Sequence, residues 1–254
     1  METYNQNFAR FYNFAAGGFA NSIVPKILEF YEGTSIGRTN NSILDLCCGT
    51  GQFSLHCLSR GYKVTGIDIS ASMLNYAIAN TRTYFDVGQA KFIQDDATKF
   101  TLNERFGLVV ATFDSLNHLE NEVALKSCFE RVFTVSEGYF IFDLNTRAGL
   151  QKWNGVQMIE DEDMVVIVDK NFDEGNRKAY AKFSCFIRNN ESLYERAEET
   201  IFNTLYVMDN VRNALLEVGW KDVYFAKINN LNKAILQPEE ERRIFVIAKK
   251  YEIL

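Results

Sequence analysis

The stretch Ser42-Ile43-Leu44-Asp45-Leu46-Cys47-Cys48-Gly49-Thr50-Gly51 decides the fold of this chain. Its apolar run leads into a glycine turn that opens a helix. A second apolar run ends at Asp68, seventeen residues after that turn. A Rossmann-like half presents a nucleoside in this way, because the turn lies under the polar tail of the ligand and the acid reaches the ribose hydroxyls. The two segments therefore predict a nucleoside site at the carboxyl ends of two neighbouring strands.

Asp45 lies in the segment that feeds the turn and narrows the choice of nucleoside. A carboxylate at this position repels a pyrophosphate at short range, and it suits a ligand that carries an ammonium group. S-adenosylmethionine is an adenosine that has an ammonium group and no phosphate. We therefore expect S-adenosylmethionine as the cofactor and S-adenosylhomocysteine as its product.

The overall charge argues against a nucleic-acid partner. The 254 residues carry a formal net charge of −6, and no run of Lys or Arg suggests a basic face, which a phosphate-backbone partner requires. No apolar run reaches the roughly 18 residues of a membrane span, and residues 1–6 lack the layout of a signal peptide. We expect no nucleic-acid partner, no membrane and a cytoplasmic location.

The five cysteines form no Cys-x-x-Cys pair and no metal-like spacing with His56 or His118. Reduced thiols in a reducing compartment are the expected state, and we expect no metal site.

Strands and helices alternate along the first 150 residues. Residues 4–32 have a helical pattern that is broken at Gly17-Gly18. The apolar runs that follow predict strands over about 42–47, 62–68, 90–94, 106–112 and 138–144. Helices are expected between them, over about 51–60, 71–81 and 121–134. This order predicts an α/β fold with a parallel sheet, right-handed crossovers and a ligand at the carboxyl ends of the strands.

The pattern changes after Gly149. Alternating short runs over 156–206 predict antiparallel strands that form an inserted β lobe. A helix is expected over about 207–218, and strands over about 221–228 and 243–250 are expected to pair as an antiparallel hairpin. We divide the chain into an N-terminal and cofactor-binding part (1–148), a lobe (149–206) that roofs the acceptor pocket or forms a homodimer contact, and the closing elements of the core (207–254).

These features resemble the class I S-adenosylmethionine-dependent methyltransferases, a family with a Rossmann-like seven-stranded, mostly parallel sheet whose last strand is antiparallel. Asp45, Gly49 and Gly51 match the first motif of the family, whereas Cys47 replaces its first glycine. Asp68 matches the acid that binds the ribose. The resemblance also implies that Asp95-Asp96-Ala97 holds the adenine amino group, with Asp96 as its acceptor.

Within the family, the chain is similar to small-molecule methyltransferases, including sugar-amine N-methyltransferases, which share the turn over 112–119 and a β-rich insert. That resemblance implies that His118 and Tyr12 face the acceptor or the cofactor as catalytic residues. A histidine in this place could deprotonate a hydroxyl, or orient an amine and relay its proton, so nitrogen and oxygen acceptors both remain open.

Further residues near the strand ends complete the expected site. The residues assigned to the cofactor, in addition to those of the motifs, are Ile69, Met73, Ala97, Phe113 and Asn117. Asp143 and Asn145, at the end of the fifth strand, are assigned to the acceptor.

Three other functions compete with this interpretation. A nicotinamide oxidoreductase shares the layout, but its Gly-x-Gly-x-x-Gly pattern fails at Ser54. A nucleic-acid methyltransferase often has a proline-bearing catalytic tetrapeptide after the fourth strand, and Phe113-Asp114-Ser115-Leu116 contains no proline. A non-catalytic module that binds S-adenosylmethionine is the third.

Overall fold

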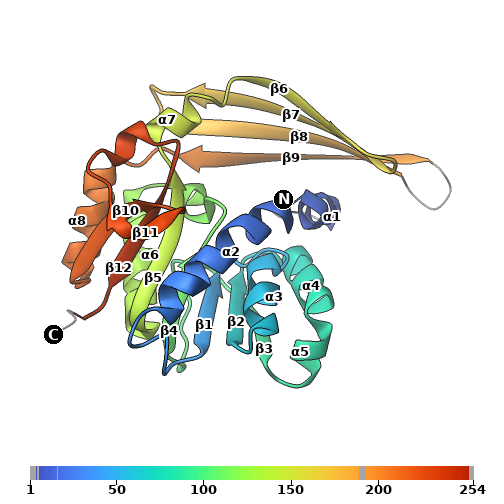
Figure 1. The fold of residues 1–254 in the computed structure, drawn as a ribbon. Coiled ribbons are helices and arrows are strands. Elements are labelled where there is room, and N and C mark those ends of the chain that lie inside the picture. The colour runs from blue at the N-terminus through green and yellow to red at the C-terminus, as the bar shows by residue number, and fades with distance from the viewer. Residues whose placement is uncertain (1–3, 5, 16, 189–192, 252–254) are drawn as a thin grey trace.

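The computed structural model describes residues 4, 6–15, 17–188 and 193–251. It contains a large sheet covered by helices and a second, four-stranded sheet that extends above it (Figure 1). The helix α1 lies between the two sheets, beneath the long strands of the second one.

The large sheet has the order β11-β10-β12-β5-β4-β1-β2-β3. Its strands are β1 (Ser42–Leu46), β2 (Lys63–Asp68), β3 (Ala90–Gln94), β4 (Phe106–Ala111), β5 (Ser136–Asn145), β10 (Asp222–Lys227), β11 (Asn230–Ala234) and β12 (Arg243–Lys249). The strands β1 to β5 pair in parallel, and β12 pairs antiparallel with both β5 and β10. These pairings confirm the predicted α/β, Rossmann-like sheet, its antiparallel last strand and the closing hairpin.

The predicted count of seven strands is wrong by one. The extra strand, β11, lies in the connection between the two strands of the hairpin and pairs antiparallel with β10 at the edge of the sheet. Four of its five residues are exposed, so its sequence carries too little apolar signal to distinguish a strand from a loop.

Helices cover both faces of the large sheet. The first face packs against α2 (Gly17–Glu32) and α3 (Gln52–Ser59), and the second packs against α6 (Glu122–Val135) and α8 (Met208–Val218). The central strand β4 is buried along its whole length, as expected for a parallel strand between two helical layers. The remaining helices are α1 (Gln6–Ala15), α4 (Ala71–Asn80), α5 (Arg82–Asp86), α7 (Arg147–Leu150), and the 3₁₀ turns η1 (Ser115–His118) and η2 (Pro238–Glu240).

N-terminal capping explains where two helices near the ligand edge, α4 and α6, begin. The Ser70 hydroxyl accepts a hydrogen bond from the Met73 amide at 3.2 Å and caps α4. Asn121 caps α6 in the same way through the Ala124 amide. The helical break expected at Gly17-Gly18 falls slightly earlier, because α1 ends at Ala15 and α2 begins at Gly17.

The second sheet, here called the lobe, is antiparallel in the order β6-β7-β8-β9. Its strands are β6 (Gly155–Glu160), β7 (Met164–Asp173), β8 (Lys178–Arg188) and β9 (Tyr194–Thr204). Its inner face packs on α1 through a third hydrophobic cluster. In this cluster the centroid of the Phe183 ring lies 5.1 Å from that of Phe8 and 5.6 Å from that of Phe11. The expected antiparallel insert is therefore present, and its part in a homodimer stays a prediction.

A buried network of asparagines joins the lobe to the large sheet. The Asn117 side-chain amide donates to the carbonyls of Asn145 (3.2 Å) and Thr204 (2.9 Å), while its oxygen accepts from the Asn145 amide at 2.9 Å. Asn145 in turn donates to Asn203 on β9 at 2.8 Å. This network, here called the asparagine clamp, ties η1, β5 and β9 together beside the ligand edge.

Among the described residues, no helix is both long and apolar enough to cross a bilayer.

The clamp predicts a stability effect of Asn117→Ala. The substitution leaves the Thr204 carbonyl and the Asn145 amide buried without this partner, and such groups cost about 1–3 kcal/mol each. We expect the free energy of unfolding in urea to fall by about 2–4 kcal/mol. Asn232→Ala, on the exposed edge strand β11, is the control and should change it little. Equal losses in both variants would contradict the clamp.

Candidate active site

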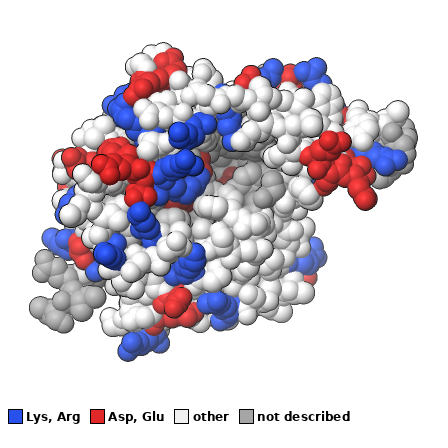
Figure 2. All heavy atoms as spheres, turned by 45° about the horizontal axis from the view of Figure 1, so that its top comes forward, with Lys and Arg blue, Asp and Glu red and all other residues white. Residues whose placement is uncertain are grey.

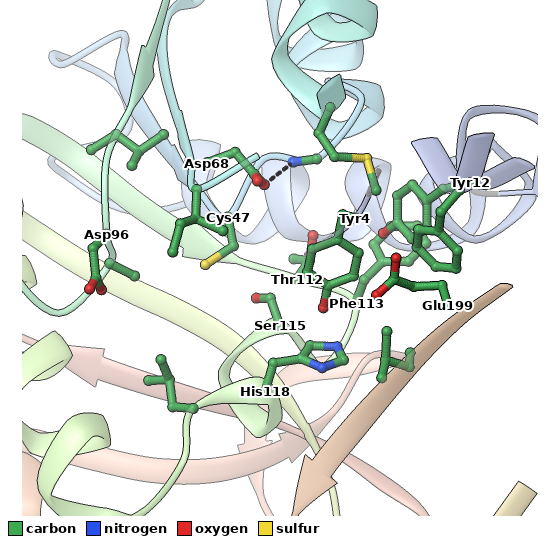
Figure 3. A pocket seen from close by; sticks show the side chains of 18 of the residues that line it. Tyr4, Tyr12, Cys47, Asp68, Asp96, Thr112, Phe113, Ser115, His118 and Glu199 are labelled. Atoms are coloured by element: carbon green, nitrogen blue, oxygen red, sulfur yellow. Dashed lines mark hydrogen bonds between the residues drawn. The ribbon is translucent and has the colours of Figure 1, made fainter. Parts of the chain in front are cut away.

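A cavity of about 460 Å³ opens at the carboxyl ends of the parallel strands, within the range of about 300–1,000 Å³ typical of small-molecule sites. Figure 3 shows side chains from the N-terminal segment, the strand ends and the lobe converging on it. Its lining residues are Tyr4, Phe8, Tyr12, Cys47, Gly49, Ile67, Asp68, Ile69, Met73, Asp95, Asp96, Ala97, Thr112, Phe113, Ser115, His118, Leu119, Glu199, Thr200, Ile201 and Phe202.

The glycine turn forms one wall of this cavity. Cys47 and Gly49 both have left-handed backbone conformations, with φ of 57° and 53°. A Cβ at position 49 would lie 3.2 Å from Cε1 of Tyr12, so only glycine leaves room there for the backbone to approach a ligand. Gly51, with φ of 77°, is the residue before α3 and packs on Ala77 instead of lining the cavity.

Asp68 lies at the end of β2 and is held by backbone amides. Its carboxylate accepts hydrogen bonds from the amides of Gly49 (2.8 Å) and Ser70 (2.9 Å). Burial raises the pKa of Asp68, and these hydrogen bonds oppose the rise. The side chain lines the cavity and is only 8% exposed (Figure 3). It therefore has the placement that the ribose prediction requires.

Asp96 and Ala97 line the same end of the cavity, together with the exposed side chain of Ile69. Burial raises the pKa of Asp96, hydrogen bonds from Thr98 and Lys99 lower it, and the net shift is downward. An ionised acceptor beside an exposed apolar side chain matches the groups that an adenine ring requires. The adenine role of Asp96 stays a prediction.

Asp45 lies behind the turn and is 1% exposed. Its Oδ2 accepts a hydrogen bond from the Ser54 hydroxyl at 2.6 Å, and burial raises its pKa to about 7. Asp45 is absent from the described cavity lining, so its expected contact with the ammonium group of the cofactor stays a prediction.

Polar groups from three parts of the chain meet at the other end of the cavity. His118 comes from η1, Tyr4 and Tyr12 from the N-terminal segment and α1, and Glu199 from β9 (Figure 3). The Tyr4 ring stands edge-on to the imidazole, with 6.1 Å between centroids. Burial lowers the pKa of His118, against opposing effects of Asp114 and a hydrogen bond with the Phe202 backbone. The imidazole is therefore neutral near pH 7, whereas Tyr12, whose pKa burial raises well above its ordinary value, keeps its proton.

Three other residues assigned from the sequence lie away from the described lining. Asn117 and Asn145 form the asparagine clamp, and Asp143 pairs with Arg243. Their direct contacts with a ligand stay predictions. The assigned residues that do line the cavity are Tyr12, Cys47, Gly49, Asp68, Ile69, Met73, Asp96, Ala97, Phe113 and His118.

The sequence did not single out Tyr4, Ser115 or Glu199. Side chains of β9 alternate between the two faces of the lobe, and this alternation could have placed Glu199 on the inner face. Glu199 lies opposite Phe183 on the face that packs on α1. Tyr4 lies in the short segment before α1 and carried no such signal.

The residues present fit S-adenosylmethionine. The described lining contains four carboxylates (Asp68, Asp95, Asp96, Glu199) and neither Lys nor Arg, which suits a cationic ligand without phosphate. The Ser115 hydroxyl is buried at the cavity wall beside the Cys47 thiol, and a hydroxyl oxygen has lone pairs that a ligand group can also use. The described part of the chain holds no group of three or more His, Cys, Asp or Glu arranged for a metal ion.

Residues 43–136, which contain the turn, Asp68 and Asp96, match the family model of a methyltransferase domain. The chain is an S-adenosylmethionine-dependent methyltransferase. This assignment decides against the nicotinamide oxidoreductase alternative.

Proteins of similar length match about nine tenths or more of the chain. A provisionally named methyltransferase of Geobacillus sp. strain WCH70 is 27% identical over 233 residues, which cover 90% of this chain and 91% of that protein. The crystal structure of an S-adenosylmethionine-dependent methyltransferase from Clostridium acetobutylicum superposes with a TM-score of 0.79 at 22% identity, covering 95% of this chain and 97% of the other. The sugar N-methyltransferase KedS8 from Streptoalloteichus superposes with a TM-score of 0.71 at 14% identity, covering 92% and 88%.

The burial of Asp45 predicts a pH-dependent stability difference. Its folded-state pKa of about 7 exceeds the unfolded value near 4, so the folded state holds the proton more tightly. Wild-type stability is then lost as the pH rises from about 4 to about 7, by about 1.4 kcal/mol per unit from this group.

Asp45→Asn removes the titrating group and keeps an oxygen for Ser54. The free energy of unfolding of this variant minus that of the wild type should rise by about 2–3 kcal/mol between pH 5 and pH 8, measured in urea. Asp169→Asn, on the exposed side of β7, provides the control. A difference that stays constant with pH would show that Asp45 titrates normally.

Proposed function

We propose that this methyltransferase modifies a nitrogen or oxygen nucleophile of a small-molecule acceptor, with S-adenosylmethionine as donor and S-adenosylhomocysteine as product. The observation that supports this best is one cavity with two chemically different ends, an acidic nucleoside end and an end enclosed by α1 and β9. Figure 2 shows the hollow beneath the lobe with mostly uncoloured walls, while Lys and Arg gather to one side of it. Such a surface suits a small acceptor better than a phosphate backbone.

The residues that would hold the cofactor are those of the first end. Asp68 would bind the ribose, Asp96 and Ile69 the adenine, and the turn at Gly49 would let the backbone approach the polar tail. S-adenosylmethionine, when bound, supplies a methyl group on a positively charged sulfur, which becomes a neutral thioether when the methyl group leaves. The contribution of the protein is then mainly alignment of the two reactants, worth on the order of 7–11 kcal/mol in well-oriented systems.

His118 would act as a general base that accepts a proton from the acceptor. A nucleophile must present a lone pair, and a neutral imidazole can take a proton from a hydroxyl or an ammonium group. The imidazole lies at the cavity wall, and burial keeps its pKa low enough for it to be neutral. The protonated phenols of Tyr4 and Tyr12 line the same end and would act as hydrogen-bond donors.

A nitrogen acceptor is favoured over an oxygen acceptor by Glu199. This carboxylate lies at the acceptor end among the aromatic side chains of Phe8, Tyr12 and Phe113. A carboxylate with aromatic rings is the combination that recognises an organic cation such as a protonated amine. The printed function of KedS8, a sugar N-methyltransferase, agrees with this chemistry.

The proposal is tested with the purified chain in two steps. Calorimetry with S-adenosylhomocysteine should show binding. Incubation with S-adenosylmethionine and separate sets of amino sugars, other primary amines, phenols and a structured RNA should then give a methylated small molecule by mass spectrometry, with an amine modified first. Methylation of the RNA alone, or binding without any transfer, would overturn the proposal.

His118→Ala is expected to separate binding from turnover. Loss of the imidazole should reduce kcat for the acceptor found above by about 10²–10⁴-fold, the usual contribution of a general acid–base group. Affinity for S-adenosylhomocysteine should be retained, because the binding groups of the first end remain. His56→Ala, on α3, is the control variant. Unchanged turnover in His118→Ala would remove the histidine from the mechanism.

Glu199→Gln tests the amine preference. The substitution keeps the shape of the side chain and removes its charge, so KM for an amine should rise about 10–100-fold, as for loss of a hydrogen bond to a charged group. Glu198→Gln is a matched control, because Glu198 is exposed and pairs with Lys182 and Arg196. An equal KM in wild type and Glu199→Gln would mean that the carboxylate does not recognise the acceptor.

A further inference from the structure

Arg243 is the first residue of β12 and lies at the ligand edge of the large sheet. The strand runs antiparallel to β5, and its register places Arg243 opposite Asn145, the last residue of β5. Only a strand of reversed direction brings its first residue to the edge where the parallel strands end. Arg243 therefore reaches the site from a position 129 residues along the chain from Asp114, in the turn after β4.

The Arg243 guanidinium binds two carboxylates at once. Its Nη2 lies 2.7 Å from Oδ1 of Asp114, and its Nη1 contacts Oδ2 of Asp143. The Asp143 side chain is fully buried, and its Oδ2 also accepts the Asp114 backbone amide at 3.0 Å. A buried carboxylate needs a counter-charge of this kind, and a guanidinium can bind two acceptors in fixed geometry.

This network holds an unusual turn. Phe113 and Asp114, which follow β4, are both non-glycine residues in the left-handed conformation, with φ of 67° and 47°. Two such residues in succession are disfavoured for L-amino acids and persist where surrounding contacts determine them. Here the Phe113 ring lies 4.4 Å from Phe19 and 6.0 Å from Tyr12, and the guanidinium carbon of Arg243 lies 5.0 Å from the centre of the Phe19 ring.

The turn leads directly into η1 and His118. The Asp114 carbonyl accepts the Asn117 amide at 2.9 Å, so the place of Asp114 sets the start of η1. The titratable groups around the imidazole are Tyr4 from the N-terminal segment, Asp114 from the turn and Glu199 from β9. Of these, Asp114 is the one that Arg243 neutralises.

We infer that Arg243 is a positioning residue of the active site, which holds the left-handed turn that presents Phe113 and His118 to the cavity. Arg243 does not line the described cavity and acts through Asp114 and Asp143. The importance of this role for catalysis rests on the proposed function. The effect of Arg243 on the turn can be tested without cofactor or acceptor. Failure of this inference is therefore distinguishable from failure of the proposed function.

The test uses the two histidines of the chain, His56 and His118. With histidine labelled by ¹³C and ¹⁵N in the full chain, the imidazole resonances report position and titration midpoint for each ring separately. The variants are Arg243→Gln, Arg243→Lys, Asp114→Asn, the double variant Arg243→Gln/Asp114→Asn, and Arg242→Gln as an exposed control of the same charge change.

In Arg243→Gln the midpoint of His118 should rise by about 0.5–1 unit, because the negative charge of Asp114 loses its partner. The double variant should return the midpoint toward or below the wild-type value, since Asp114 no longer carries a charge. Arg243→Lys, which keeps a charge but loses the fork, should shift the His118 resonances less than Arg243→Gln. His56 should stay unchanged throughout.

Three outcomes would overturn the inference. They are an unchanged His118 in Arg243→Gln, an equal change in Arg242→Gln, and a double variant that shifts as much as Arg243→Gln alone. If Arg243→Gln does not fold, Arg243→Lys and Asp114→Asn decide the question. Unmoved His118 resonances in both would then show that the network does not position the turn.

Discussion

The insertion of β12 between β5 and β10 is the constraint on which the site depends. Its reversed direction places a cation at the edge where every parallel strand ends, and the carboxylates of Asp114 and Asp143 gather around that cation. Because Asp143 is fully buried, its charge is tolerable only beside the guanidinium. The strained turn after β4 is held by the same pair. A topological feature of the sheet thus becomes a feature of the cavity wall that carries His118.

Electrostatics divide the molecule into two regions. The described lining of the cavity contains no Lys or Arg side chain. Arg243 lies just behind that lining, where it forms ion pairs with Asp114 and Asp143. The ligand therefore meets carboxylates, phenols and a neutral imidazole. This arrangement favours a positively charged donor and disfavours phosphates. The negative character comes from individual placed side chains, since the overall charge of −6 is spread over 254 residues.

Local patterns predicted most of the fold and about half of the residues that line the cavity. The strand–turn–helix at 42–51 and the acid at Asp68 are set by neighbours in sequence, so their placement could be foreseen. Asn117 and Asn145 carried polar groups at the right edge, but the sequence does not reveal that their side chains turn toward one another and toward β9. Glu199 and Arg243 reach the site only through tertiary pairing, and β11 is too polar to show itself.

The packing of α1 has a thermodynamic consequence. Its aromatic residues touch the glycine turn through Tyr12 and the lobe through Phe8 and Phe11, so one helix connects the turn to the lobe across the cavity. Under the proposed function, an effect of one ligand on this helix is felt by the other ligand, because binding linkage is reciprocal. The two binding steps would then share one structural element.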